Sequence, residues 1–119
     1  METHPSPRQL AQEYMRIFFE SHDFDRLLEI CAPDLQFDGP FFEGNTAREY
    51  VDSLRHGPPV DCGYDLLFEF YDATHAHLVY DFIKGQIRTP MSQTFEVDDG
   101  LIQKIKLIFD TEPFGHSAS

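Results

Sequence analysis

The sequence predicts a single α+β domain, in which a cone-shaped, curled antiparallel sheet packs on three N-terminal helices. Two observations point to this class. Helix start signals with helical apolar spacing fill the first half of the chain, and alternating apolar and polar residues fill positions 62–109. Three helices bury a four-stranded sheet only if the sheet curls around them. We expect one domain over residues 1–119, with its core at about residues 6–112.

The first two helices have clear start signals. The run Ser6–Gln9 places Ser at the N-cap, Pro at the first helical position and Gln three residues after the cap. This helix is expected to run to about Ser21. Asp23 is expected to cap a second, shorter helix, which Pro33 ends.

A short strand and a third helix are expected next. Residues Leu35–Asp38 form a short extended piece, which the following Gly-Pro pair closes. Thr46 and Glu49 have capping-box spacing and open the third helix. This helix is expected to end at Gly57 in the left-handed conformation, just before two prolines.

The last two strands form a hairpin. Its loop is expected to be Asp98-Asp99-Gly100, with Gly at positive φ, so that Val97 pairs with Leu101. Gln93 then lies opposite Ile105 as the one polar residue of a buried row, where an amide needs a hydrogen-bond partner. The buried row is Met91, Gln93, Phe95, Val97, Leu101, Ile105, Leu107 and Phe109, and the outer row is Ser92, Thr94, Glu96, Ile102, Lys104, Lys106 and Ile108.

The first strand of this hairpin is also expected to pair with the strand before it, which makes a second hairpin. One further strand precedes these. Gly85-Gln86 is typical of a two-residue loop with Gly first, which pairs Lys84 with Ile87. This register places Leu78, Tyr80 and Phe82 inside and His77, Val79 and Asp81 outside, whereas a slip of one residue would reverse the faces. In the preceding strand the inner row is expected to be Cys62, Tyr64, Leu66, Phe68 and Phe70.

Charge and composition exclude several classes of partner. Nine Lys and Arg residues against twenty-one Asp and Glu give a formal net charge of −12, so we expect neither nucleic acid nor a membrane surface as partner. No apolar run approaches membrane-spanning length, and the first ten residues lack the pattern of a signal peptide. We therefore expect a cytoplasmic protein with Cys31 and Cys62 as reduced thiols. No cofactor motif is present in the sequence, so no cofactor is expected.

The aromatic residues favour a pocket for a small apolar organic molecule. Twelve Phe residues supply more apolar lining than a small core needs. The expected ligand-binding residues lie on the inward faces of the helices and strands. They are Tyr14, Met15, Phe18, Phe37, Tyr50, Leu54, Tyr64, Phe68, Tyr80, Met91, Gln93, Phe95, Ile105, Leu107 and Phe109.

The pattern resembles the nuclear transport factor 2-like (NTF2-like) superfamily, and within it the small SnoaL-like proteins of bacteria. The segments that support the resemblance are His22–Asp25, Cys31–Pro40, Phe42–Thr46 and Val97–Asp110. The resemblance implies the same cone-shaped fold. The superfamily includes steroid Δ-isomerases, polyketide cyclases, epoxide hydrolases, dehydratases and members without enzymatic activity, so the fold does not specify a reaction.

The catalytic residues of isomerase-like members are only partly matched. Their general-base Asp stands immediately before a Pro, whereas here a Gly precedes Pro40 and Asp38 lies one position earlier. Their oxyanion-binding Tyr corresponds to Met15, beside Tyr14, and their protonated Asp corresponds to Gln93. We therefore do not predict ketosteroid-type isomerisation.

Two groups of residues have both a functional and a structural interpretation. Tyr14, Tyr80 and Gln93 form either a donor cluster for a carbonyl or enolate oxygen or a satisfied structural network. Asp38 is either a general base at the cavity mouth or an exposed carboxylate at a strand end, and its parity with Gln36 favours the exposed position.

No metal site is predicted. His75 and His77 share a strand face with Asp81, but no further ligand has convincing spacing. His4 and His116 are assigned to loose chain ends, and Phe114 to the region of the cone mouth.

The resulting hypothesis is a SnoaL-like pocket protein. It is either a cofactor-free isomerase, cyclase or dehydratase acting on an apolar carbonyl compound, with Asp38 as base, or a non-catalytic ligand-binding or dimeric association module. The resemblance also implies a homodimer through the outer sheet face. There Lys104 and Lys106 would have to meet carboxylates of the partner such as Glu96.

Overall fold

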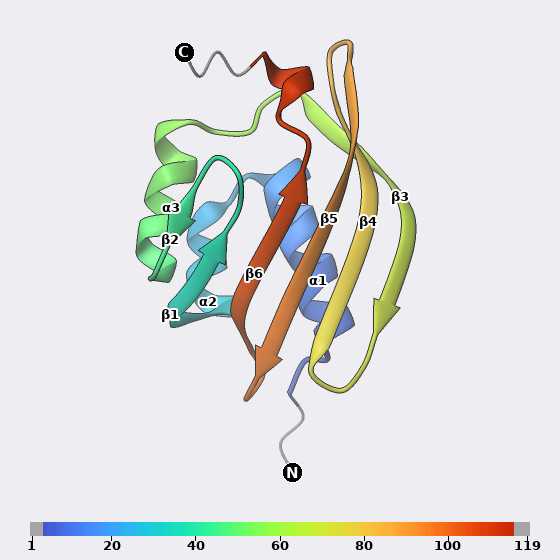
Figure 1. Cartoon of the computed structure of the whole chain (residues 1–119). Coiled ribbons are helices and arrows are strands. Elements are labelled where there is room, and N and C mark those ends of the chain that lie inside the picture. Colours follow the sequence, from blue (N-terminus) through green and yellow to red (C-terminus); the bar gives the residue numbers. More distant parts are fainter. Residues whose placement is uncertain (1–3, 116–119) are drawn as a thin grey trace.

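A six-stranded sheet with helices on one side makes up the computed structural model, which describes residues 4–115 (Figure 1). The strand order is β2-β1-β6-β5-β4-β3; β1 runs parallel to β6, and the remaining neighbours are antiparallel. In chain order the elements are α1 (Pro7–Arg16), the π turn η1 (Ile17–Ser21), the 3-10 turn η2 (Phe24–Arg26), α2 (Leu27–Ile30), β1 (Cys31–Asp38), β2 (Glu43–Gly44), α3 (Ala47–His56), β3 (Cys62–Tyr71), β4 (His75–Lys84), β5 (Ile87–Asp98), β6 (Leu101–Phe109) and the 3-10 turn η3 (Glu112–Phe114).

The predicted α+β class is confirmed, because three helices pack on one curled sheet. In this arrangement α1 contacts β4 and β5, and α3 contacts β1. The sheet is mixed rather than wholly antiparallel, since β1 joins it beside β6. Pro33 was expected to end a helix but lies within β1. The β1–β6 register shifts between Cys31 and Gln36, so the missing N–H of this proline falls in an irregular stretch of the ladder.

The start of α1 is as predicted. The Ser6 hydroxyl accepts from the Gln9 N–H, and the Gln9 side chain accepts from the Ser6 N–H, which completes the capping box. After Arg16 the helix widens into the π turn, which the His22 N–H closes by donating to the Ile17 carbonyl at 2.9 Å. The helical stretch therefore reaches Ser21, as expected, but its last turn contains one extra residue.

Three details of the other helix ends differ from the predictions. The Asp23 side chain makes no capping bond, and a 3-10 turn precedes α2. Thr46 accepts from the Glu49 N–H as expected, but the Glu49 carboxylate accepts from the Asn45 N–H, so the box is not reciprocal. Gly57 has φ −135° and is not left-handed.

The β4–β5 hairpin has the predicted register throughout. Gly85 has φ +61°, Lys84 pairs with Ile87, and Leu78 pairs with Gln93. Its inner and outer faces are therefore the predicted ones.

The predicted register of the β5–β6 hairpin is wrong. The loop contains only Asp99 and Gly100, both at positive φ, and a bulge follows Glu96. Gln93 consequently pairs with Leu107 rather than Ile105. Ile102, expected on the outer face, is fully buried.

The second half of β3 faces the opposite way from the prediction. A β-bulge between Leu66 and Phe68 inserts one residue and reverses the alternation beyond it. Phe68 and Phe70 therefore lie on the outer face, where they are about 60% exposed (60% and 61%) and stack on each other.

The two hairpin faces depend on the turn at Gly85, so its substitution tests the register. Gly85→Ala should lower the free energy of unfolding by about 1–2 kcal/mol, because an L-residue is strained at φ +61°. Urea denaturation measures this effect. The matched control is Gly63→Ala, since neither site has an atom within 4 Å of an added Cβ and Gly63 is not at positive φ. Equal unfolding free energies for the two variants would contradict the strained turn.

Candidate functional site

A cavity of about 410 Å³ lies between the helices and the concave face of the sheet. Its walls come from α1, the π turn η1, α3, the loop between β1 and β2, strands β1, β4, β5 and β6, and η3. The expected residues that line it are Tyr14, Phe18, Phe37, Tyr50, Leu54, Tyr80, Met91, Gln93, Leu107 and Phe109. The sequence therefore indicated most of the wall, although ligand binding itself remains a proposal.

The other expected ligand-binding residues lie elsewhere. Met15, Phe95 and Ile105 are fully buried in the core and do not line the cavity. Tyr64 lies behind the ring of Phe19, at 4.7 Å between centroids. Phe68 was expected inside but is on the outer face, because of the bulge in β3.

Several lining residues were not among the expected ones. They are Phe19, Gly39, Pro40, Phe41, Phe42, Ser53, Gly57, Phe82 and Phe114. Phe82 had been placed on the inner face, so its contribution follows from the β4–β5 register. The α-helical spacing of apolar residues did not predict an inward position for Phe19. It lines the cavity beside Phe18 because the chain forms a π turn there.

Three phenylalanine rings surround the opening of the cavity. Phe41, Phe109 and Phe114 lie 5.2–5.6 Å apart between centroids and come from the β1–β2 loop, the end of β6 and η3. Phe41 lines the cavity and is 59% exposed, which identifies this side as the one that meets solvent. The assignment of Phe114 to the cone mouth is thus confirmed, while His116 lies outside the described residues.

The polar groups of the cavity form two neighbouring hydrogen-bonded pairs. The hydroxyls of Tyr14 and Tyr50 bond each other, and the Tyr80 hydroxyl donates to Gln93 Oε1 at 2.7 Å. The Gln93 amide lies close enough to Tyr14 to lower the pKa of that phenol, so the two pairs are neighbours. Since Oε1 accepts from Tyr80, the amide N–H groups of Gln93 remain as donors. The arrangement can present donors to one oxygen of a bound molecule.

These phenols are neutral at physiological pH. Burial raises the pKa of Tyr14 and outweighs the hydrogen bond with Tyr50 and the nearby Gln93 amide, which lower it. Burial also raises the pKa of Tyr50 and of Tyr80. Within residues 4–115 no carboxylate, imidazole, amine or guanidinium lines the cavity. The described walls of the site are therefore uncharged.

Asp38 lies outside the cavity. Its carboxylate accepts from Lys106 Nζ at 2.9 Å on the outer face, and its side chain is 44% exposed. The pKa of Asp38 is lowered, chiefly by this hydrogen bond with Lys106, so the carboxylate is a weaker base than a free one. The structure thus favours the exposed strand-end position over that of a base at the mouth.

His75, His77 and Asp81, which share a strand face, do not gather into a ligand cluster. His77 Nδ1 and Nε2 lie 2.7 and 3.2 Å from the hydroxyls of Thr94 and Ser92. Among residues 4–115 no three His, Cys, Asp or Glu side chains come close enough to hold a metal ion.

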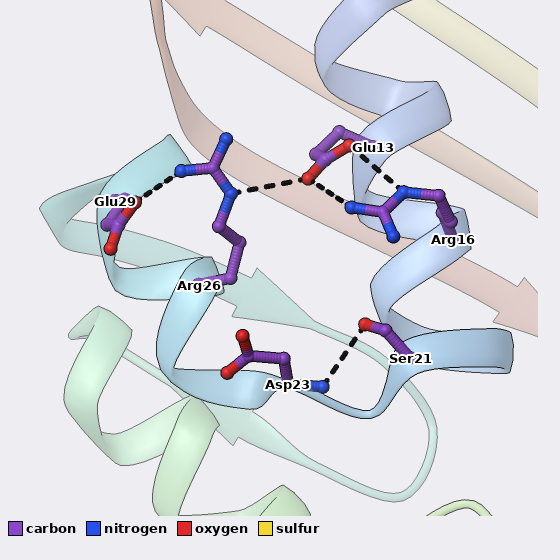
Figure 2. A network of polar contacts seen from close by, with 6 residues as sticks. All are labelled: Glu13, Arg16, Ser21, Asp23, Arg26 and Glu29. Atoms are coloured by element: carbon purple, nitrogen blue, oxygen red, sulfur yellow. Dashed lines mark hydrogen bonds and ion pairs between the residues drawn. The ribbon is translucent and has the colours of Figure 1, made fainter.

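A surface network fixes α1 to the segment that follows the π turn (Figure 2). Glu13 accepts from Arg16 at 2.7 Å and from Arg26 at 3.3 Å, and Arg26 in turn bonds Glu29. The pKa of Glu13 is lowered, chiefly by Arg16. Exposed pairs of this kind stabilise weakly, but here they join both ends of the turn that positions Phe18 and Phe19.

Solved structures of similar shape place the chain in a known fold. An NTF2-like protein of unknown function from Cytophaga hutchinsonii is 18% identical, with 96% of this chain and 98% of that chain covered and a TM-score of 0.79. A protein from Kribbella flavida is 25% identical over 95% and 93% of the two chains, also with a TM-score of 0.79. A SnoaL-like protein from Jannaschia sp. CCS1, provisionally assigned as a polyketide cyclase, is 13% identical over 98% and 95%, with a TM-score of 0.74.

These likenesses confirm the predicted NTF2-like fold and do not specify a reaction. No protein-family model and no curated protein sequence matches the chain. In the part of the chain that is described, no helix is long and apolar enough to cross a membrane.

The tyrosine pKa values give a direct test of how far the folded chain shields its phenols from water. All five tyrosines have a raised pKa, that of Tyr71 rising to about 12. In an absorbance titration the folded protein should show little tyrosinate at pH ~10, where an unfolded chain is about half ionised. Because the folded pKa values are raised, the stabilisation is complete below pH ~10 and is lost as pH rises above it. Titration of most tyrosines at pH ~10 before unfolding would contradict the structure.

Proposed function

We propose that the cavity binds a small, uncharged and largely apolar organic molecule with one carbonyl or hydroxyl oxygen. The observation that supports this most directly is the presence of two neighbouring hydrogen-bonded pairs, Tyr14 with Tyr50 and Tyr80 with Gln93, in a wall of mostly apolar residues. A volume of about 410 Å³ falls within the usual range of small-molecule sites.

Electrostatics support a neutral ligand. Burying an ionised group without a partner is costly, and the described walls hold no opposite charge. The chain as a whole has a formal net charge of −12, which further disfavours anions. The free donors of Gln93 and of one phenol favour a carbonyl oxygen as the acceptor.

The same donors support a second candidate function, cofactor-free isomerisation, cyclisation or dehydration of a carbonyl compound. Donors aimed at a carbonyl oxygen stabilise the enolate that forms when hydroxide from the solvent takes a proton from the adjacent carbon and becomes water. Exchange of the methyl hydrogens of a bound methyl ketone in deuterated water distinguishes the two functions. A binder leaves the exchange rate at its buffer value, whereas a catalyst raises it and loses that effect in Tyr14→Phe.

We also propose that a second copy of the chain covers the outer sheet face. Phe68, Phe70 and Ile108 are exposed there, and an apolar group of this kind favours association. The charges around them are balanced despite the acidic chain, since Arg88 pairs with Asp65 and Asp81. Lys104 lies opposite Glu96 and Lys106 bonds Asp38 of the same chain, so neither lysine needs a carboxylate of the partner, contrary to expectation.

The ligand proposal is tested by calorimetric titration with methyl naphthyl ketone and with naphthoate, which has a similar size but is an anion. The ketone should bind at least ~10-fold more tightly than naphthoate. The double variant with Tyr80→Phe and Gln93→Leu removes both partners of the Tyr80–Gln93 hydrogen bond. It should weaken ketone binding by about 3–10-fold. Gln36→Leu, on the exposed side of β1, is the control. Equal affinity for ketone and naphthoate would refute the proposal.

The association proposal is tested by sedimentation equilibrium. The protein should have twice the mass of one chain, and Phe70→Glu should shift it to the mass of one chain, because a charge would be buried in the interface. Val60→Glu is the control, since Val60 is 48% exposed in the loop before β3, away from this face. A single-chain mass for the unaltered protein would exclude the dimer.

A further inference from the structure

The π turn brings two consecutive phenylalanines to the cavity. Its backbone hydrogen bond runs from the His22 N–H to the Ile17 carbonyl, five residues back. The angle about the helix axis between consecutive side chains is therefore smaller than in an α-helix. Phe18 and Phe19 both line the cavity, and Ile17 beside them is fully buried. The two rings pack edge to face at 4.8 Å between centroids.

Phe19 stands between the cavity and the edge strand of the sheet. Its ring lies 4.7 Å from that of Tyr64 on β3, and 6.1 and 6.3 Å from those of Phe82 and Tyr80 on β4. Tyr64 pairs with Phe82 and shares its inner face, yet Phe82 lines the cavity and Tyr64 does not. The Phe19 ring thus ends the cavity at β4, one strand short of the edge of the sheet.

We propose that Phe19 is a specificity-determining residue that limits the length of the molecule the cavity accepts; this inference rests on the proposed function. Adjacent strands are about 4.8 Å apart, so removing the ring extends the cavity by roughly that distance, as far as Tyr64. The extension is sufficient for a further fused ring. It is lined by Tyr64 and Phe82, so the preferred ligand remains an uncharged, flat ketone.

A series of aryl methyl ketones with one, two and three fused rings tests the inference: acetophenone, methyl naphthyl ketone and methyl anthryl ketone. Calorimetric titration gives the dissociation constants of each for the unaltered protein and for Phe19→Ala. In the unaltered protein the three-ring ketone should bind more weakly than the two-ring ketone. In Phe19→Ala the ratio of these dissociation constants should change by about 10-fold or more in favour of three rings.

Two further variants keep the test decisive. Phe19→Leu retains more of the buried volume and should shift the ratio in the same direction by a smaller factor, so it replaces Phe19→Ala if that variant does not fold. Val60→Ala removes an exposed apolar side chain that does not line the cavity and should leave the ratio unchanged.

The outcomes separate this inference from the proposal on which it rests. If the unaltered protein binds none of the ketones, the proposed function fails and the inference falls with it. If the unaltered protein binds the shorter ketones but the folded Phe19 variants keep its ratio, the proposed function stands and the role of Phe19 is refuted.

Discussion

The buried hydroxyl and amide groups of Tyr14, Tyr50, Tyr80 and Gln93, which must all find partners away from water, are the constraint on which the rest of the structure depends. These side chains come from α3, α1, β5 and β4, and each is at most 3% exposed. A buried polar group without a partner is destabilising, and within residues 4–115 every fully buried side-chain oxygen or nitrogen has one. The Tyr14–Tyr50 bond joins α1 to α3 and the Tyr80–Gln93 bond joins β4 to β5, and aromatic rings wall the space between these helices and the sheet.

The sequence predicted which side chains face the core in strands whose register is set by a turn and is not interrupted by a bulge. The Gly85 turn gave every pair from Lys84 with Ile87 to Leu78 with Gln93 correctly. The second half of β3 was predicted wrongly because of a bulge, and the β5–β6 pairing because of a bulge and a loop one residue shorter than predicted. A bulge is decided by twist and by contacts with the neighbouring strand, so an alternating pattern within one strand does not contain it.

The candidate site was predictable to a similar extent. Tyr14, Tyr80 and Gln93 were grouped from helical spacing and strand parity alone, and the structure brings them together. Asp38 was the one candidate base, and its parity with Gln36 already favoured the outer face, where Lys106 holds it. Phe19 could not be predicted, because its position depends on one extra residue in a helical turn rather than on residue type.

The phenylalanine rim of the cavity has a consequence for kinetics. Phe114 belongs to a single turn whose backbone bonds are local, from the Phe114 N–H to Thr111 and from the Gly115 N–H to Glu112. If the proposed ligand binds, lifting this short turn would open the rim without separating any strand. The residence time of that ligand would then depend on the stability of the turn, so two proteins with identical inner walls but different segments after β6 would retain the same molecule for different times.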